Sequence, residues 1–271
     1  MSSGTNMLGP DLGHVIASAL DSGAGTAYVV DPTPTMLRAL IETGVNADRS
    51  DPVRVLASRG ALKSVADEFT AATAAAELVE RGAVEFRVGS AEAGNALVIT
   101  DERVVAVVDV AGRAAGLGTD DNGFVGTAAE TYRAQFDAAD PFTLRTPGLS
   151  TVRSSLNSEL GGAVQSDFDA VFESLEADDG PDLDAVVVSL LVAARNDVLL
   201  YDVSRWGEDV GIASKATFSR TKTELEECGA IETEKVPIDV GRPRLRLQLG
   251  DERLRTAAPE RLAAVAAELV G

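Results

Sequence analysis

Residues 201–249, YDVSRWGEDVGIASKATFSRTKTELEECGAIETEKVPIDVGRPRLRLQL, hold the pattern that decides the fold of the C-terminal part of the chain. Apolar residues recur at helical spacing in the first part of this segment and alternate with polar residues in the last part. Gly211 lies in a short turn between the two helical stretches, and Ser214 can cap the second of them. The expected elements are helices over Tyr201–Val210 and Lys215–Cys228 and strands over Ile231–Val236 and Arg244–Leu249.

A further helix is expected before these elements. Leu183–Arg195 is apolar nearly all round, which predicts a helix that is buried on every side. Three helices with a tight turn and a two-stranded hairpin form a winged helix-turn-helix, whose third helix enters the major groove of DNA. We therefore expect an α+β winged-helix DNA-binding domain over residues 181–250, with double-stranded DNA as its partner.

Charge is distributed unevenly along the chain. The 271 residues hold 43 Asp and Glu against 24 Lys and Arg, a net charge of −19, yet residues 212–249 hold six acidic and seven basic residues. The nine residues Lys215–Thr223 hold no carboxylate. A local loss of acidity in a strongly acidic chain is the expected footprint of a surface that meets phosphates.

Candidate DNA contacts come from the expected third helix and from the hairpin. On the helix, Phe218 and Leu225 mark the buried side, and small, hydroxyl-bearing and cationic residues lie off it. Such side chains donate to phosphates and base edges. In the hairpin, three arginines spaced by two share one face, which suits phosphate or minor-groove contact. The predicted contacts are Ser214, Lys215, Ala216, Thr217, Ser219, Arg220, Lys222 and Thr223 on the helix and Arg242, Arg244 and Arg246 on the hairpin.

Structural roles are the alternative for several of these residues. The expected third helix could be a surface helix in a helical bundle. Arg246 could pair with Glu232 or Glu234 across the hairpin as readily as it contacts DNA. Trp206 and Cys228 are expected in the core, and the neighbouring glutamates disfavour a thiolate at Cys228.

The first 145 residues alternate strand and helix and then add a hairpin, which predicts an α/β domain with a mostly parallel sheet. The pattern indicates one long helix over residues 61–81, a hairpin over 96–110 and a Gly- and Asp-rich loop over 112–126. Open parallel sheets bind ligands beyond their strand ends. Arg113, the one cation of this loop, makes a phosphorylated sugar or another anionic metabolite the candidate ligand.

A helical neck and linker over residues 146–180 and a C-terminal helix within residues 251–271 complete the expected organisation. Winged helices gain affinity when a dimer links two half-sites, so a homodimer is expected. Apolar stripes within Thr151–Leu175 or Pro259–Val270 could supply its interface, and the first stretch could equally be a spacer.

Composition excludes several classes of protein. The longest apolar run is too short to span a bilayer, and one cysteine and one histidine (His14) exclude an internal disulfide and a His-rich metal site. No signal peptide is expected, because residues 1–13 carry no Lys or Arg and no sustained apolar stretch. No metal, cofactor or catalytic residue is predicted, and a cytoplasmic protein without a membrane partner is expected. Only four residues are Lys and aromatics make up 4%, which favours adaptation to high salt over a merely acidic surface.

SKATFSRTKTELEECG, residues 214–229, resembles the recognition helix of many bacterial and archaeal winged-helix regulators. Residues 182–250, with ATFSRTK in the helix and GRPRLRL in the hairpin, resemble the TbsP-like family of haloarchaeal winged-helix transcriptional regulators. That resemblance implies control of central sugar metabolism genes, the setting of the TrmB-type sugar-sensing regulators. Such helices usually carry an apolar residue at Thr221 or Lys222, and two polar residues leave open a shallow helix or a rotated contact face.

ALVITDERVVAVVDV, residues 96–110, followed by a helix, resembles the phospholipase D-like effector domains of some archaeal winged-helix regulators. Active members of that fold carry a His-x-Lys motif on such a hairpin, twice, and this hairpin has no histidine. The resemblance therefore implies a catalytically empty domain with a sensor role. The alternative is an α/β phosphodiesterase or sugar-phosphate enzyme whose winged helix contacts protein.

Overall fold

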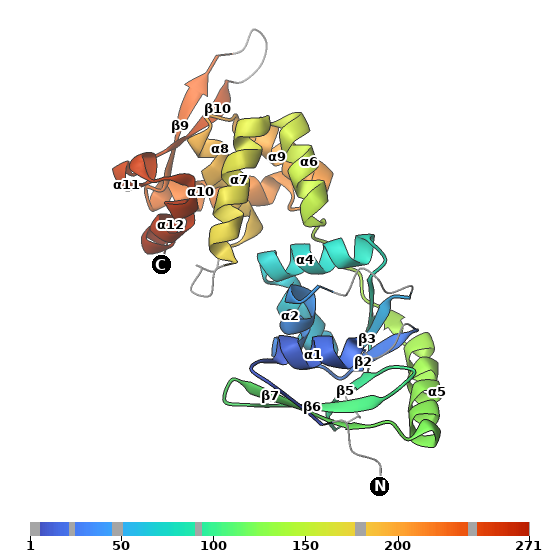
Figure 1. Cartoon of the computed structure of the whole chain (residues 1–271). Coiled ribbons are helices and arrows are strands. Elements are labelled where there is room, and N and C mark those ends of the chain that lie inside the picture. The colour runs from blue at the N-terminus through green and yellow to red at the C-terminus, as the bar shows by residue number, and fades with distance from the viewer. Residues whose placement is uncertain are drawn as a thin grey trace. The chain divides into compact units, whose positions relative to one another are not determined.

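The computed structural model describes residues 6–21, 25–44, 51–89, 94–176, 183–237 and 243–270. The chain divides into two compact units (Figure 1). The first comprises residues 1–67 and 74–144, and the second comprises residues 68–73 and 145–271. No helix in the described ranges is long and apolar enough to cross a membrane.

The described strands of the first unit form one eight-stranded sheet in the order β1-β7-β6-β5-β2-β3-β4-β8. The β2–β3 and β3–β4 pairs are parallel, and the other five pairs are antiparallel. The prediction of a mostly parallel sheet is therefore wrong, because the hairpins add antiparallel strands to a short parallel centre. The strands are β1 Met7–Gly9, β2 Ala27–Val30, β3 Val53–Ala57, β4 Val84–Val88, β5 Ala96–Ile99, β6 Val104–Val110, β7 Arg113–Thr119 and β8 Asp140–Pro141.

The prediction of a loop over residues 112–126 is also wrong, because these residues form strand β7 and the start of helix α5 (Asn122–Ala138). Its glycines suggested a loop, but Gly116 serves close packing within the sheet. A Cβ at Gly116 would lie 2.8 Å from Cγ1 of Val105 on the neighbouring strand. Arg113 consequently begins a strand at a tight hairpin turn and does not lie in a loop.

The helices of the first unit lie on both faces of the sheet. Val15 of α1 packs on the face that holds Gly116, whereas α5 packs over Tyr28 and Ile99 on the opposite face. The single helix predicted over residues 61–81 is two helices, which are separated at Asp67, the C-cap of the first. The helices that precede α5 are α1 Leu12–Leu20, α2 Pro34–Glu42, α3 Arg59–Ala66 and α4 Phe69–Glu80.

The second unit is built around helix α8, whose residues 186–194 are all buried, as predicted from their apolar character. Trp206 is fully buried and its Nε1 donates to Ser155 Oγ at 2.9 Å, so its assignment to the core is confirmed. The elements of this unit are α6 Leu149–Glu159, α7 Gly162–Leu175, α8 Ala185–Arg195, α9 Leu200–Val210, α10 Lys215–Glu227, β9 Ile231–Val236, β10 Arg244–Leu249, α11 Glu252–Thr256, the 3-10 turn Pro259–Arg261 and α12 Leu262–Val270.

The segment expected as a neck belongs to the core of this unit. Helices α6 and α7 bury their apolar stripes in the same cluster as α8, and an ion pair of 2.6 Å between Arg153 and Asp169 joins them. Leu262 and Ala266 of α12 are buried in that cluster too. Intrachain packing therefore occupies the stripes that were candidates for a dimer interface. The linker predicted at residues 177–181 lies outside the described residues.

Candidate nucleic-acid interface

The helix-turn-helix consists of α9, a turn over residues 211–214, and α10. Gly211 ends α9 in the left-handed region with φ 96°, which glycine adopts without strain. A Cβ at Gly207 would lie 2.3 Å from the ring of Phe218, which is fully buried, so this glycine allows α10 to pack closely on α9. The Ser214 hydroxyl accepts from the Thr217 N–H at 3.2 Å, which confirms the predicted cap.

One side of α10 is buried, and three residues form it. Phe218 and Leu225 lie on this side as predicted, and Thr221 lies between them with 6% of its surface exposed. Thr221 thus occupies a core position despite its hydroxyl group. A polar residue at this position therefore leaves the helix packed along the expected stripe.

The opposite side of α10 is exposed and holds no carboxylate before Glu224. Arg220 is its most accessible cation, because 72% of the side chain is exposed. Its ion pair with Glu224, one turn further on, is 3.9 Å long, and exposed pairs of this kind contribute little. The residues on this side are Lys215, Ala216, Ser219, Arg220 and Thr223, and Thr217 is half-buried beside them.

Lys222 points away from the exposed side. Its Nζ donates to Glu226 at 2.6 Å, and only 12% of the side chain is exposed. Thr233 of β9 donates to the same carboxylate at 2.7 Å, so Glu226 joins α10 to the hairpin. Burial alone would raise the pKa of Glu226, but hydrogen bonds from Lys222 and Thr233 outweigh it and hold the pKa below the ordinary value.

Lys215 begins α10 and is tied to the helix before it. Its Nζ donates to Glu208 of α9 at 2.6 Å, and both side chains are nearly half exposed. The hydrogen bond lowers the pKa of Glu208 and raises the pKa of Lys215. Because both groups remain charged at neutral pH, Lys215 presents a partly neutralised cation at the start of the helix.

The hairpin presents Arg244 and Arg246 on one face, as predicted. In the antiparallel register Arg244 lies opposite Val236 and Arg246 opposite Glu234. Leu247 and Leu249, on the alternate face, are buried. Arg242 lies outside the described residues.

Both described arginines of the hairpin have partners. Arg246 pairs with Glu234 at 3.3 Å, which is the cross-strand alternative considered from the sequence. Arg244 pairs with Asp202 of α9 at 3.7 Å, and its guanidinium lies 4.3 Å from the centre of the Tyr201 ring. These pairs are 35–55% exposed, so water and salt weaken them.

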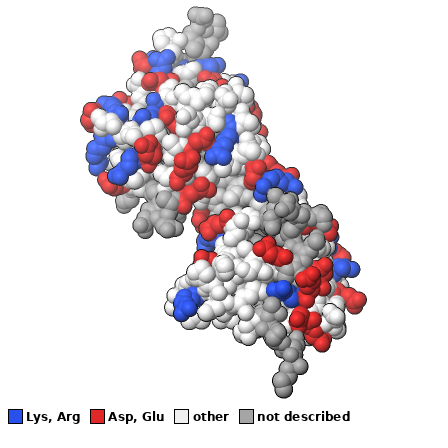
Figure 2. Space-filling model, viewed as in Figure 1, with Lys and Arg blue, Asp and Glu red and all other residues white. Residues whose placement is uncertain are grey.

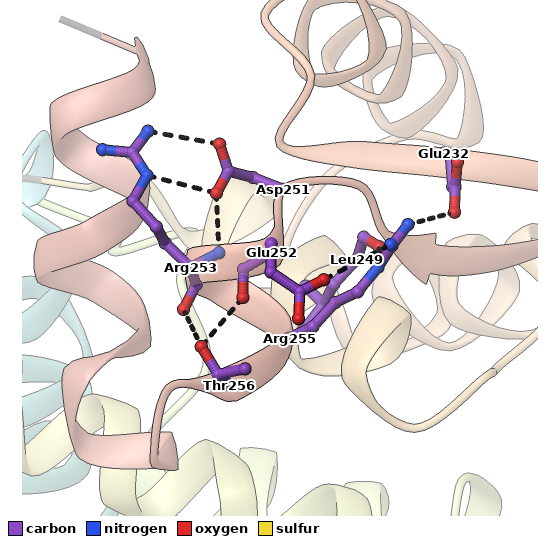
Figure 3. A network of polar contacts seen from close by, with 7 residues as sticks. All are labelled: Glu232, Leu249, Asp251, Glu252, Arg253, Arg255 and Thr256. Carbon is purple, nitrogen blue, oxygen red and sulfur yellow. Dashed lines mark hydrogen bonds and ion pairs between the residues drawn. The ribbon is translucent and has the colours of Figure 1, made fainter.

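Contacts at the base of the hairpin connect it to the rest of the second unit. The N–H of Leu247 donates to the carbonyl of Val198 at 3.0 Å, which places the segment before α9 beside β10. Figure 3 shows the side chain of Arg255 reaching from α11 to the hairpin, where it donates to the carbonyl of Leu249 on β10 and to Glu232 on β9. Glu232 is therefore engaged by Arg255, while Glu234 is the glutamate that pairs with Arg246.

The first unit offers a less suitable site for an anion. A cavity of about 500 Å³ lies beside α1 and α2, and Arg113 is not part of its lining. Asp11, Glu42 and Asp109 line it together with one guanidinium, that of Arg38. Within the described residues, no three His, Cys, Asp or Glu side chains are placed to hold a metal ion.

Comparison with known proteins connects both units to one family. Residues 4–147 match the model of the N-terminal domain of TbsP-like transcriptional regulators. Residues 148–267 match the model of the C-terminal helix-turn-helix domain of the same regulators. A search of curated proteins found no match.

Several solved structures are distantly similar. One is TrmBL2, described as an archaeal chromatin protein with a novel mode of DNA binding, with a TM-score of 0.37 and 13% identity over 51% of this chain and 54% of that chain. The present chain thus spans about half the length of TrmBL2. The phospholipase D family member Nuc from Salmonella typhimurium has a TM-score of 0.36 at 12% identity, and NucT from Helicobacter pylori 0.37 at 13%; each match covers 52% of this chain and 99% of the other.

The two family models together span almost the whole chain, and the family is one of transcriptional regulators and not of enzymes. The bundle alternative for α10 is therefore replaced by a helix-turn-helix, the class of domain that binds double-stranded DNA. The chain belongs to the TbsP-like transcriptional regulators.

Proposed function

We propose that α10 is the recognition helix and that its exposed side enters the major groove of promoter DNA. The observation that carries this proposal is the exposed side of α10 from Lys215 to Thr223, which holds no carboxylate in a chain with 43 acidic residues. Ser219 and Thr223 flank Arg220 one helical turn apart, and both are exposed. Arginine donates two hydrogen bonds to a guanine edge, and hydroxyl groups bond to bases or phosphates.

Helix geometry determines which part of α10 fits the groove. A helix of 13 residues is about 20 Å long, and the major groove is about 12 Å wide. The first turns of a recognition helix contact base edges, whereas its end lies farther from them. Glu224 and Glu227, the exposed carboxylates of α10, lie past Thr223 and so outside the proposed contact region.

The hairpin is proposed as a phosphate-binding wing. Arg244 and Arg246 share one face, and a phosphate can replace their partly exposed ion pairs at small cost, although Arg244 also contacts the Tyr201 ring. Arg242, two residues before Arg244, is predicted to extend this face. Lys222 has a structural role in this proposal. Its Nζ donates to the carboxylate of Glu226, and Thr233 of β9 donates to the same carboxylate.

Replacement of Arg220 tests the recognition helix. Arg220→Ala should weaken binding to the best genomic site by about 1–3 kcal/mol and change non-specific binding much less, if Arg220 bonds to a base. The matched control is Arg261→Ala, which removes the same charge from an exposed arginine outside the helix-turn-helix. Fluorescence anisotropy titrations of the full chain with both DNAs measure the difference. Equal specific affinity for Arg220→Ala and the control would exclude Arg220 from base contact.

We further propose that the chain acts as a homodimer on central sugar metabolism genes and responds to a phosphorylated sugar or another anionic metabolite. The support is the sequence resemblance to the family together with the gain in affinity from linking two half-sites. Binding of the metabolite should change DNA affinity through a coupling of about 1–3 kcal/mol. Thermal shift and DNA titrations with a panel of glycolytic intermediates test this. If no compound changes either quantity, the metabolite proposal fails while DNA binding stands.

A further inference from the structure

One part of the sheet in the first unit has no helix over it within the described residues. On the face that holds Val104 and Ile99, helix α5 packs on β2 and β5. The same face continues across β6, β7 and β1, because the register pairs Ala106 with Leu117 and Ala115 with Leu8. In Figure 1, α5 lies at the β5 side of the sheet, and it leaves most of β6 and β7 beyond Val104 uncovered on this face.

The uncovered face is apolar and strongly exposed. Leu8 is 70% exposed, Val110 65%, Leu117 55% and Val108 39%, and two alanines complete the group. Large apolar side chains that are contiguous and exposed usually mark an interaction site. We name the set Leu8, Ala106, Val108, Val110, Ala115 and Leu117 the apolar sheet face.

Charge indicates which partner fits this face. None of the outward residues of β1, β6 and β7 on this side is acidic, although the chain carries a net charge of −19. The surface over β6 and β7 in Figure 2 is correspondingly almost free of acidic residues, whereas acidic residues gather over α5. Two copies of such an acidic chain repel one another least when they meet through a surface without carboxylates. The apolar sheet face meets that condition.

The two ends of the apolar sheet face carry opposite charges. Arg113 lies at the end where β6 turns into β7, and it is exposed. Glu102, before β6, and Asp120, after β7, lie at the other end, and both are exposed as well. A seven-residue strand spans about 20 Å, so the cationic and acidic ends are separated by that length.

We propose that the apolar sheet face is the homodimer interface, with a second copy of this chain packed face to face across a two-fold axis perpendicular to the strands. That axis reverses the strand direction and brings Arg113 of one copy to the acidic end of the other. A two-fold axis parallel to the strands would instead place Arg113 of one copy opposite Arg113 of the other. This inference rests on the homodimer of the proposed function, and it assigns Arg113 to the interface and not to a metabolite.

The size of the face sets the expected affinity. The two seven-residue strands β6 and β7 and the three-residue strand β1 cover at most about 20 by 14 Å, which is small for a specific protein interface. The dimer should therefore dissociate in the micromolar range, and DNA with two half-sites should strengthen it. Sedimentation velocity of the full chain without DNA, from about 1 to 200 μM, measures the equilibrium.

Leu117→Glu should raise the dimer dissociation constant at least tenfold, because it buries a carboxylate against the partner. The matched control is Val79→Glu, since Val79 is 42% exposed on α4 and lies outside the face. Arg113→Asp should also weaken the dimer, and adding Asp120→Arg should restore it. Circular dichroism of each variant confirms that the fold is retained.

Three results would overturn the interface. A wild-type chain that stays monomeric at 200 μM would mean that another protein or segment covers the face. A dimer that Leu117→Glu and Val79→Glu affect equally would place the interface elsewhere. Failure of Leu117→Cys, in a Cys228→Ser background, to cross-link between copies with a short thiol-reactive linker would exclude a face-to-face arrangement. Because these measurements omit DNA, they are independent of the recognition helix.

Discussion

The exposed side of α10 and the hairpin β9–β10 carry the same kinds of cationic residue, but their cations are held differently. Arg220 is 72% exposed and its ion pair measures 3.9 Å. Arg246 pairs with Glu234 at 3.3 Å, and Arg244 contacts both Asp202 and the Tyr201 ring. Residue type and spacing select candidate DNA contacts in both regions. The intrachain partner of each cation determines how readily that cation can exchange its ion pair for a contact with DNA.

The two regions differ in how firmly their cations are held within the chain and in how specifically those cations can recognise DNA. An exposed ion pair contributes about 0–1 kcal/mol, so the hairpin arginines lose little when they move to phosphates. Phosphate contact is sequence-independent, whereas a bidentate contact from Arg220 to a base discriminates by about 1–3 kcal/mol. We therefore expect α10 to determine sequence preference and the hairpin to supply general affinity.

The largest effect is expected for the close packing of α10 on α9. Gly207→Ala places a Cβ against the buried ring of Phe218 and should lower the free energy of unfolding by about 1–3 kcal/mol. The control is Gly126→Ala in α5, where no atom lies within 4 Å of the new Cβ and the helix should gain up to about 1 kcal/mol. Urea unfolding monitored by Trp206 fluorescence measures Gly207→Ala, and far-UV circular dichroism measures both. Equal stability of the Gly207→Ala chain and wild type would show that α9 and α10 do not need this close approach.

The hairpin should affect all DNA sequences alike. Replacing Arg244 and Arg246 by Ser should weaken specific and non-specific binding by similar factors. The salt dependence should flatten by about one unit of slope for each lost phosphate contact. Titrations from low to high salt with both DNAs provide the test. An altered sequence preference with an unchanged slope would assign base contacts to the hairpin and remove the contrast with α10.

Ser214 allows the cap to be separated from DNA contact. Ser214→Ala removes the hydrogen bond to Thr217 N and should destabilise the second unit by about 1 kcal/mol. Ser214→Asp retains a capping group, so stability should be kept while the added negative charge weakens DNA binding. Thermal unfolding together with a DNA titration distinguishes the two variants. If both variants bind DNA like wild type, the start of α10 lies outside the interface.

The smallest effect concerns the contact between α10 and β9. The pKa of Glu226 is lowered in the folded chain, so its stabilising contribution is present above its ordinary pKa and is lost as the pH falls through the folded-state value. Glu226→Gln should therefore be less stable than wild type at pH 7, and the difference should shrink below about pH 4.5. Urea unfolding across this pH range measures the difference. A difference that does not vary with pH would mean that the charge of Glu226 is not what joins the helix to the hairpin.

The winged helix could be predicted from sequence because its signals are local. The turn glycine, the Ser214 cap and the Phe218–Leu225 stripe lie within a few turns of one another. The core role of Thr221 could not be predicted from its polarity, since packing against neighbouring elements buries it. The partner of Arg244 is Asp202, 42 residues away, and only the fold brings them together.

The first unit was harder to predict, because tertiary contacts that the local sequence does not show determine the features that were predicted wrongly. The glycines of β7 resemble loop residues in sequence, yet Gly116 is required by the close approach of Val105. The break between α3 and α4 contains neither Gly nor Pro, so periodicity alone suggested one helix. The stripes of α6 and α7 looked available for a dimer because the sequence does not show that α8 covers them.

Guanine methylation interference on the best genomic site tests the recognition helix most directly, because methylation at N7 blocks the major-groove edge that arginine contacts. With wild type, methylation of at least one guanine in each half-site should prevent binding. With Arg220→Ala, sensitivity at that guanine should disappear while the remaining pattern persists. An identical pattern for both chains, or no effect of N7 methylation on wild type, would contradict the assignment of α10 as the helix that contacts the bases.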